Sequence, residues 1–323
     1  MIEKVVSEDA AGQRLDKFLQ RVLPAVPVSH LYKLLRTRQV RVNGQRAKGD
    51  RLLNAGDRVA VRGTPEALLG PAPQGRQAPL PLDQFKASIV YEDQQLLAVN
   101  KPAGLAVHPG SGIEGATLVD LARAYVAKPP EGEFEASPGH RLDRDTSGVV
   151  LVAKTRRCMV RLVEIFTEGS ARKRYLALAK GRFSETNGII ELPLAEHQQT
   201  RRSREERGVN LQVAVTHYRA LAEAEAVTLL ECRIETGRTH QIRRHLAAVG
   251  HPITGDRRYG DFAFNRRIKA ESGLRRMFLH SAALELAHPI TGHPLRLEAP
   301  LPDELAAPLR ALGIAWPLSA RAS

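Results

Sequence analysis

The chain has 323 residues, and its 48 Lys and Arg against 35 Asp and Glu give a net charge of +13, which favours a polyanionic partner such as nucleic acid or an anionic membrane surface. Hydrophobic residues make up 43% of the chain, but no run of about 18 of them occurs, so we expect neither wholesale disorder nor membrane insertion nor secretion. Cys158 and Cys232 lack CxxC spacing and nearby histidine pairs, so a disulfide framework and a zinc finger have no support, and a reduced, cytoplasmic protein is expected.

Residues 12–62 form the first predicted unit. Apolar residues at i, i+3, i+4 and i+7 predict a helix that is ended by Pro24: Leu15, Phe18, Leu19 and Val22. A second helix is expected after Pro27, with Ser29 as its N-cap. Short strands follow at 40–42 and 59–61, with the turn dipeptide Asn43-Gly44 after the first of them. Two helices and a basic hairpin in so short a segment are typical of a compact RNA-binding unit.

Residues 63–85 are rich in proline and glycine and are predicted to be a linker, and residues 86–318 the main domain. Strand-like apolar runs recur in this domain at 89–91, 96–99, 149–152, 175–178, 211–215, 227–230 and 284–286. Helices are fewer and are expected near 118–127, 157–167 (with Thr155 as a cap) and 239–249. This order of elements predicts an α+β fold on a mostly antiparallel sheet.

The segment 139–148, Gly-His-Arg-Leu-Asp-Arg-Asp-Thr-Ser-Gly, stands directly before an apolar strand. As a calcium loop it fails, because its twelfth position is Lys154 where a bidentate glutamate is needed. A phosphatase-type nucleophile loop would follow a buried strand, and a kinase catalytic loop has another residue order and a glycine-rich partner loop. A polar turn before a strand is the remaining interpretation for the segment by itself.

Further chemistry-bearing segments accompany it. Residues 100–110 place a lysine and a histidine in turns after a strand, where functional loops often lie. Residues 236–245 open a helix with donors suited to phosphates. The triplet 173–175 (Lys-Arg-Tyr) and residues 278–281 (Phe-Leu-His-Ser) complete the set. Each segment taken alone is compatible with a solvated basic face, whereas their combination in this order is specific.

In these motifs the chain resembles the RluA-type pseudouridine synthases, and within them the RluC-like enzymes that modify large-subunit ribosomal RNA. The signature is the His-Arg-Leu-Asp sequence with the Thr-Ser-Gly that follows, while residues 110–112 and 256–261 point to the RluC-like branch. The resemblance covers nearly the whole chain, as an S4-like RNA-binding domain followed by a catalytic domain at about 88–300. It implies the pseudouridine synthase fold and an isomerase that turns specific uridines of 23S ribosomal RNA into pseudouridine.

The resemblance also implies roles for individual residues. Asp143 is the expected nucleophile, which either attacks the anomeric carbon or assists a glycal intermediate. Arg243 is expected to hold this carboxylate ionised and oriented, since burial and RNA phosphates would raise the pKa of an unpaired carboxyl. Tyr175 is expected to stack on the base and take the C5 proton, and Leu279 to pack against the site. At these expected catalytic positions the sequence does not depart from the family pattern.

RNA contacts are expected at both ends of the chain. Arg141 is predicted to fill the space left by the flipped base, because a guanidinium stacks on bases and binds phosphate. Lys101, Arg238 and His240 are predicted to bind the RNA backbone. The N-terminal unit would add salt-sensitive phosphate contacts through Lys33, Arg36, Arg38 and Arg41. No metal or cofactor is expected, and the predicted protein is a monomer whose partner is 23S ribosomal RNA or a large-subunit assembly intermediate.

Two other functions remain as alternatives. A non-catalytic ribosome-associated RNA-binding protein would lack the aspartate, the tyrosine or the arginine, and all three are present. An RNA methyltransferase would need a glycine-rich loop after a strand and an acidic residue for the ribose. The nearest candidate loop is 110–112, which follows Pro109 and has no acidic partner.

Overall fold

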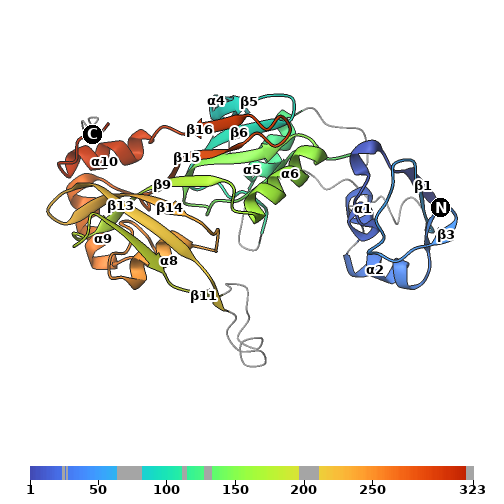
Figure 1. The fold of residues 1–323 in the computed structure, drawn as a ribbon, viewed down its shortest axis with the longest axis horizontal. Helices are drawn as coiled ribbons and strands as arrows, with labels where there is room; N and C mark the ends of the chain where they lie inside the picture. The colour runs from blue at the N-terminus through green and yellow to red at the C-terminus, as the bar shows by residue number, and fades with distance from the viewer. Residues whose placement is uncertain are drawn as a thin grey trace.

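The computed structural model describes residues 1–23, 26, 28–63, 82–110, 115–126, 133–195 and 211–317. A small N-terminal unit lies beside a larger domain that is built on one long sheet (Figure 1). The α+β fold on a mostly antiparallel sheet, predicted from the sequence, is confirmed. Most of the predicted linker, residues 64–81, lies outside the described residues.

The N-terminal unit is a four-stranded antiparallel sheet covered by two helices. Its strands have the order β1-β4-β2-β3. The bounds are β1 (Ile2–Val5), η1 (Glu8–Ala10), α1 (Leu15–Val22), α2 (Val28–Arg36), β2 (Val40–Val42), β3 (Gln45–Arg46) and β4 (Arg58–Val61). The predicted apolar stripe of α1 is buried in the core of the unit. Two details differ from the prediction: β1 precedes residue 12, and Ser29 lies inside α2, because the helix already begins at Val28.

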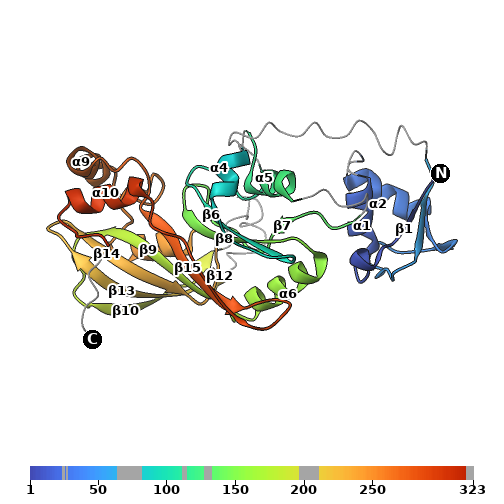
Figure 2. The same cartoon turned by 90° about the horizontal axis from the view of Figure 1, so that it is seen from above.

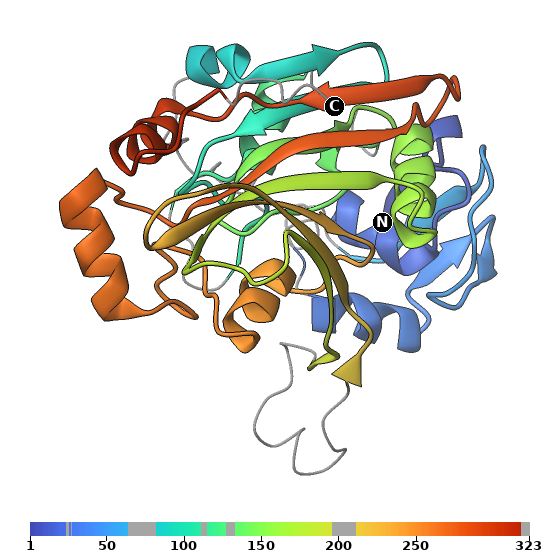
Figure 3. The same ribbon diagram turned by 60° about the vertical axis from the view of Figure 1, so that its left-hand side comes forward.

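The large domain contains a sheet of ten strands. Its main path is β10-β13-β14-β9-β15-β8-β6-β5, with β16 beside β15 and β7 beside β8. The bounds are β5 (Ile89–Glu92), β6 (Leu96–Lys101), β7 (Ser137–Pro138), β8 (Ser147–Ala153), β9 (Arg172–Lys180), β10 (Asn187–Glu191), β13 (Val215–Glu223), β14 (Val227–Ile234), β15 (Leu279–Ala287) and β16 (Pro294–Glu298). A separate pair is formed by β11 (Leu194–Ala195) and β12 (Leu211–Gln212). The strands fan around a strong twist (Figure 3).

One pair in this sheet is parallel, and it positions the site. Strands β8 and β15 run in the same direction, with Ser147 opposite His280 and Gly148 opposite Ser281. Gly148 has φ +117°, and a Cβ there would overlap the backbone of Ser281. The signature motif therefore ends in a glycine because β8 enters the sheet in close contact with β15.

The helices of the large domain are α4 (Leu82–Ala87), α5 (Leu118–Tyr125), α6 (Arg156–Thr167), α8 (Gln241–Ala248), α9 (Phe262–Ser272) and α10 (Asp303–Ala311). The predictions of α5, α6 and α8 are confirmed, and the Thr155 hydroxyl caps α6 by accepting the N–H of Cys158. The other three helices were not predicted. In α9 only Ile268 is buried, so this helix has no apolar period, and α10 contains Pro308, a residue that argues against a helix in the sequence.

The helices divide between the two faces of the sheet. Leu118 of α5 and Ile242 of α8 share one core with Tyr175 and Val150. Leu162 of α6 belongs to a second core on the opposite face of β8, as Figure 2 shows for α5 and α6. Helices α9 and α10 cover the far end of that face through a further core. The ends of β8, β9 and β15 are thereby held firmly next to α8, where the signature motifs meet.

The N-terminal unit contacts the large domain through η1. The Asp9 carboxylate accepts the backbone N–H groups of Phe134 at 2.7 Å and of Arg156 at 3.2 Å. Arg156 in turn donates from Nε to the carbonyl of Ala11 at 3.3 Å. Arg156 is the first residue of α6, so the carboxylate lies at the positive end of a helix dipole.

Candidate active site

The signature segment is fixed at both ends. His140 Nε2 accepts the backbone N–H of Leu151 at 3.0 Å, which ties the start of the segment to β8. Burial lowers the pKa of His140 to about 3, so the ring is neutral at physiological pH and free to accept this bond. At the other end Ser147 and Gly148 belong to β8 itself. Asp143 lies between these two anchors at the edge of the sheet.

The structure brings Asp143 and Arg243 together, although 100 residues separate them. Nη1 of Arg243 donates to Oδ2 of Asp143 at 2.9 Å. The Asp143 side chain is 20% exposed, which leaves it accessible from the neighbouring pocket. Burial alone would lower the pKa of Arg243, but hydrogen bonds to Asp256 and Asp143 outweigh it and raise that pKa, so the guanidinium stays charged.

His240 also faces Asp143. Its Nε2 lies 3.7 Å from Oδ1 of Asp143, and its Nδ1 lies 3.0 Å from the hydroxyl of Tyr259. The residue stands at the N-cap of α8 with φ 55° and ψ 30°, a left-handed conformation that non-glycine residues rarely adopt. The helix start is thus bent so that the imidazole of His240 and the guanidinium of Arg243 point to the same carboxylate.

A pocket of about 330 Å³ opens beside this carboxylate. Tyr175 of β9 and Leu279 of β15 form its apolar wall and are 7% and 4% exposed. Burial raises the pKa of Tyr175 above its usual range, despite a hydrogen bond to Ser281 that lowers it, so the phenol is protonated at neutral pH. The pocket therefore brings an aromatic side chain and a carboxylate into one small space, which suits a single planar ring such as a flipped base.

Comparisons with known proteins agree with this geometry. Residues 95–248 match the family model for RNA pseudouridylate synthase, and residues 13–59 match the S4 domain. The chain is 40% identical over 311 residues to ribosomal large subunit pseudouridine synthase C of Escherichia coli K12, with 93% of each chain covered. The enzyme of the same name from Vibrio cholerae is 38% identical over 302 residues, again with 93% of each chain covered.

The chain belongs to the RNA pseudouridylate synthase family. It is therefore an isomerase of the kind that converts uridine in RNA to pseudouridine. Among solved structures, human RNA pseudouridylate synthase domain containing 4 superposes with a TM-score of 0.61 at 27% identity, covering 73% of this chain and 97% of that one. The predicted family and the pseudouridine synthase fold of the large domain are thus confirmed.

Within this pseudouridine synthase, Lys101 does not have its predicted role. The side chain is 0% exposed, and Nζ donates to the carbonyls of Pro102 at 2.9 Å, Leu105 at 2.8 Å and Arg144 at 3.0 Å. An ammonium enclosed by three carbonyls cannot reach RNA, so the prediction of a backbone contact is wrong. Lys101 instead ties the 102–105 turn to the loop that carries Asp143.

The other cations predicted to bind RNA are accessible. Arg141 lies exposed at the mouth of the pocket, and Arg238 lines it while donating from Nε to the carbonyl of Val213 at 3.3 Å. In the N-terminal unit the residues predicted to bind phosphate are all exposed: Lys33, Arg36, Arg38 and Arg41. A second hollow of about 1110 Å³ adjoins the pocket and shares Lys173 and Arg238 with it. Among the described residues, the mouth of the pocket is therefore surrounded by positive charge.

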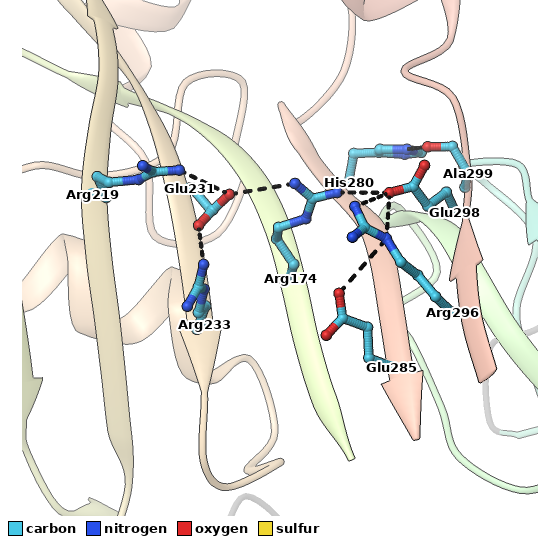
Figure 4. Close-up of polar contacts among 9 residues, drawn as sticks. All are labelled: Arg174, Arg219, Glu231, Arg233, His280, Glu285, Arg296, Glu298 and Ala299. Carbon is cyan, nitrogen blue, oxygen red and sulfur yellow. Dashed lines mark hydrogen bonds and ion pairs between the residues drawn. The ribbon is translucent and has the colours of Figure 1, made fainter. Parts of the chain in front are cut away.

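Sequence reasoning missed a polar network behind the Asp143 loop. His280 is 0% exposed, donates from Nε2 to the carbonyl of Ala299 at 3.1 Å (Figure 4), and accepts the Ser147 hydroxyl at Nδ1 at 2.9 Å. Arg276 donates from Nη2 to the same hydroxyl at 2.8 Å. Ser147 belongs to the signature and His280 to one of the accompanying segments, but no local pattern indicates that the two residues touch.

An ionic row crosses the opposite face of β14, β9, β15 and β16 (Figure 4). At its centre Glu231 is 5% exposed and contacts three guanidinium groups, from Arg233 at 3.0 Å, Arg219 at 3.5 Å and Arg174 at 3.6 Å. Arg174 continues the row by donating to Glu298 at 3.2 Å. Because side chains alternate along a strand, these residues point away from Tyr175.

The part of the chain that the structure describes contains neither a cluster of side chains able to bind a metal ion nor a membrane-spanning helix. No group of three or more His, Cys, Asp or Glu side chains among those residues is arranged to hold a metal ion. None of the helices described is both long and apolar enough to span a membrane.

Proposed function

We propose that this protein converts specific uridines of 23S ribosomal RNA to pseudouridine, with Asp143 as the nucleophilic carboxylate. The observation that carries the proposal is the pairing of Asp143 with Arg243 at the edge of a base-sized pocket floored by Tyr175. The names of the relatives supply the choice of large-subunit RNA. The net charge of +13 supports a polyanionic substrate.

The proposed reaction moves one bond within one nucleotide. The uridine flips into the pocket, at a cost of a few kcal/mol, and Arg141 stacks in the space that it leaves. The N1–C1′ bond breaks while Asp143 acts at C1′, the uracil turns against Tyr175, and C5 bonds to C1′. The C5 proton leaves to solvent and N1 gains a proton, so the formula is unchanged and neither redox cofactor nor donor is needed.

Tyr175 takes the stacking role in this proposal. Its ring forms the apolar wall of the pocket, and burial keeps the phenol protonated. A protonated phenol is a poor base, so the raised pKa of Tyr175 favours stacking over removal of the C5 proton. Leu279 completes the apolar wall beside it.

We further propose a division of labour between the two units, in a cytoplasmic protein that acts as a monomer. The N-terminal unit, with exposed Lys33, Arg36, Arg38 and Arg41, adds affinity, and the large domain performs the chemistry. The proposed N-terminal unit is residues 12–62 together with β1, which precedes them. The proposed linker is 63–85 and the catalytic domain is 86–318, and α4 begins at Leu82, within the last residues of the linker. Removal of one phosphate-binding side chain should lower the salt slope of binding by about one unit.

The test uses 23S ribosomal RNA labelled with tritium at C5 of uridine. The full chain should release tritium at sites that map as pseudouridine, without added metal or cofactor. A chain that lacks residues 1–81 should reach a similar maximal rate with a higher half-saturation and a flatter salt dependence. No release by the full chain from correctly folded RNA would contradict the function, and a truncated chain that binds normally without turnover would contradict the division of labour.

A further inference from the structure

The turn before α9 holds a buried carboxylate that contacts the back of the catalytic pair. Asp256 is 0% exposed, and both of its oxygens are occupied. Oδ2 accepts Nε of Arg243 at 2.7 Å, and Oδ1 accepts Nη2 of Arg243 at 3.0 Å. The backbone N–H groups of Arg258 and Tyr259 donate to Oδ1 at 2.8 and 3.1 Å. A buried charge with this many partners has a defined position.

The paired bonds from Asp256 fix which part of Arg243 meets Asp143. A guanidinium is planar, and two parallel bonds from one carboxylate to its Nε and Nη2 prevent rotation of the plane. Nη1 is then the nitrogen left to face the pocket, and it lies 2.9 Å from Asp143. The orientation of the catalytic pair is therefore set from behind, by a side chain that is 0% exposed.

The same turn supports the second group that faces the nucleophile. The Tyr259 hydroxyl contacts His240 Nδ1 at 3.0 Å, and the Arg243 guanidinium lies 5.1 Å from the centre of the Tyr259 ring. A Cβ at Gly260 would overlap the backbone carbonyl of Asp256, so the turn from Asp256 to Gly260 is tight. One short turn thus braces both Arg243 and His240.

Charge gives the arrangement a second consequence. One guanidinium serves two carboxylates, so its positive charge is divided between Asp143 and Asp256. The buried carboxylate takes two of its N–H groups, whereas the accessible one receives a single bond. Asp143 is therefore oriented by Arg243 without being enclosed by it, which leaves an oxygen available for reaction.

We propose that Asp256 is a positioning residue for the isomerisation, holding Arg243 so that Nη1 alone orients the Asp143 carboxylate toward the pocket. This inference rests on the proposed function. It assigns a role to a residue that is 0% exposed and does not line the pocket of Tyr175. Loss of the two parallel hydrogen bonds from Arg243 to Asp256, the fork, should therefore slow turnover without weakening RNA binding.

The experiment compares tritium release by the full chain with release by Asp256→Asn. The amide keeps the shape but places an NH₂ against a guanidinium N–H, so Arg243 loses one of the two bonds that fix its plane. We expect kcat to fall about 10- to 100-fold while KM for 23S ribosomal RNA changes less than about threefold. If the Asn variant does not fold, Asp256→Glu is used in its place. It keeps the charge but displaces the fork by one methylene, and the same fall in kcat with little change in KM is expected.

Asp261→Asn is the matched control. Asp261 ends the same turn, caps α9 by accepting the N–H of Phe264 at 2.9 Å, and pairs with Lys180 at 2.7 Å. Its replacement removes the same charge and the ion pair with Lys180, while the amide oxygen can still accept the N–H of Phe264 and cap α9, so it should leave kcat unchanged. Equal kcat in Asp256→Asn and Asp261→Asn, with an active full chain, would overturn the positioning role alone.

A double variant separates positioning from a merely structural effect. In an Arg243→Lys background the fork is already absent, so adding Asp256→Asn should lower kcat less than about threefold further. The full 10- to 100-fold loss in that background would show that Asp256 does not act through Arg243 and would overturn the inference. A full chain that releases no tritium from large-subunit RNA would overturn the proposed function and, with it, this role.

Discussion

Two ionic clusters occupy opposite faces of the same sheet and combine carboxylates and guanidinium groups in opposite proportions. In the active site one guanidinium, that of Arg243, lies between the carboxylates of Asp143 and Asp256. On the other face one carboxylate, that of Glu231, lies among three guanidinium groups (Figure 4). Glu231 is 5% exposed, whereas Asp143 is 20% exposed beside a pocket.

The difference shows what separates a structural carboxylate from a reactive one. The carboxylate of Glu231 is surrounded by three guanidinium groups and is 5% exposed, so a substrate cannot reach it. Its ion pairs connect strands β13, β14 and β9. Asp143 has one firm hydrogen bond and an open side. The proportion of cations to carboxylates, together with access, decides the role of each cluster.

Among the changes to partners of the two central carboxylates, Asp143 and Glu231, the largest effect is expected when the shared cation is changed. Arg243→Lys keeps the positive charge but cannot bind two carboxylates with a planar fork. We expect kcat to fall about 10²- to 10³-fold, because Asp143 loses its orientation. Arg244→Lys on the same helix, whose Nη1 donates to the carbonyl of Ala195 at 3.1 Å, is the control for the replacement and should stay near full activity. Similar kcat values in Arg243→Lys and Arg244→Lys would contradict the role of Arg243 in orienting Asp143.

A second test concerns His280, which is buried between Ser147 and the carbonyl of Ala299. Burial lowers the pKa of His280 from 6.5 to about 4, so the unfolded chain takes up a proton below pH 6.5 that the folded chain refuses until about pH 4. Folding stability should therefore fall as the pH drops through this window, by roughly 3 kcal/mol from this residue.

Denaturant unfolding of the full chain at several pH values measures this loss. In His280→Gln the titrating group is gone, so the stability of the variant should depend less on pH between 6.5 and 4 than that of the native chain. If the stability of the native chain falls no more steeply than that of His280→Gln between pH 6.5 and 4, His280 is not held neutral between Ser147 and Ala299.

The smallest effect is expected from the outer cluster. Glu231→Gln leaves three guanidinium groups around a neutral amide, and since Arg219 and Arg233 are 56% and 66% exposed, water compensates part of the loss. We expect the free energy of unfolding to fall by about 1–3 kcal/mol, with kcat of the folded enzyme unchanged within about twofold. Glu298→Gln, at the exposed end of the row, should cost less. A large fall in kcat for Glu231→Gln would contradict the contrast between the faces.

Much of the fold could be predicted from the sequence because local patterns determine it. The stripe of α1, the cap of α6 and the continuous apolar run of β8 all depend on neighbouring residues. Helices α9 and α10 were missed because α9 buries one residue and α10 contains a proline. Their stability comes from a core shared with Leu178 and Leu229, which lie far away in sequence.

The site was predictable only where a motif carried the information. The pairing of Asp143 with Arg243 followed from the family resemblance and is present in the structure, while its catalytic use stays a prediction. Lys101 looked like an RNA ligand because a lysine after a strand is usually solvated. Two of its three carbonyl partners belong to the turn that follows it, and the third, that of Arg144, comes from a loop 43 residues away that no local pattern brings close. The contacts of Asp256 were hidden for the same reason.

The central claim is that Asp143 is the carboxylate that reacts, and one matched pair of variants tests it. Asp143→Asn keeps the shape and loses the charge, whereas Asp145→Asn makes the same change two residues on, where the side chain is 47% exposed and pairs with Arg144. Tritium release from C5-labelled 23S ribosomal RNA should fall by about 10⁴-fold or more in Asp143→Asn, with RNA binding retained, and stay near the native rate in Asp145→Asn. Near-native release by Asp143→Asn would contradict the account.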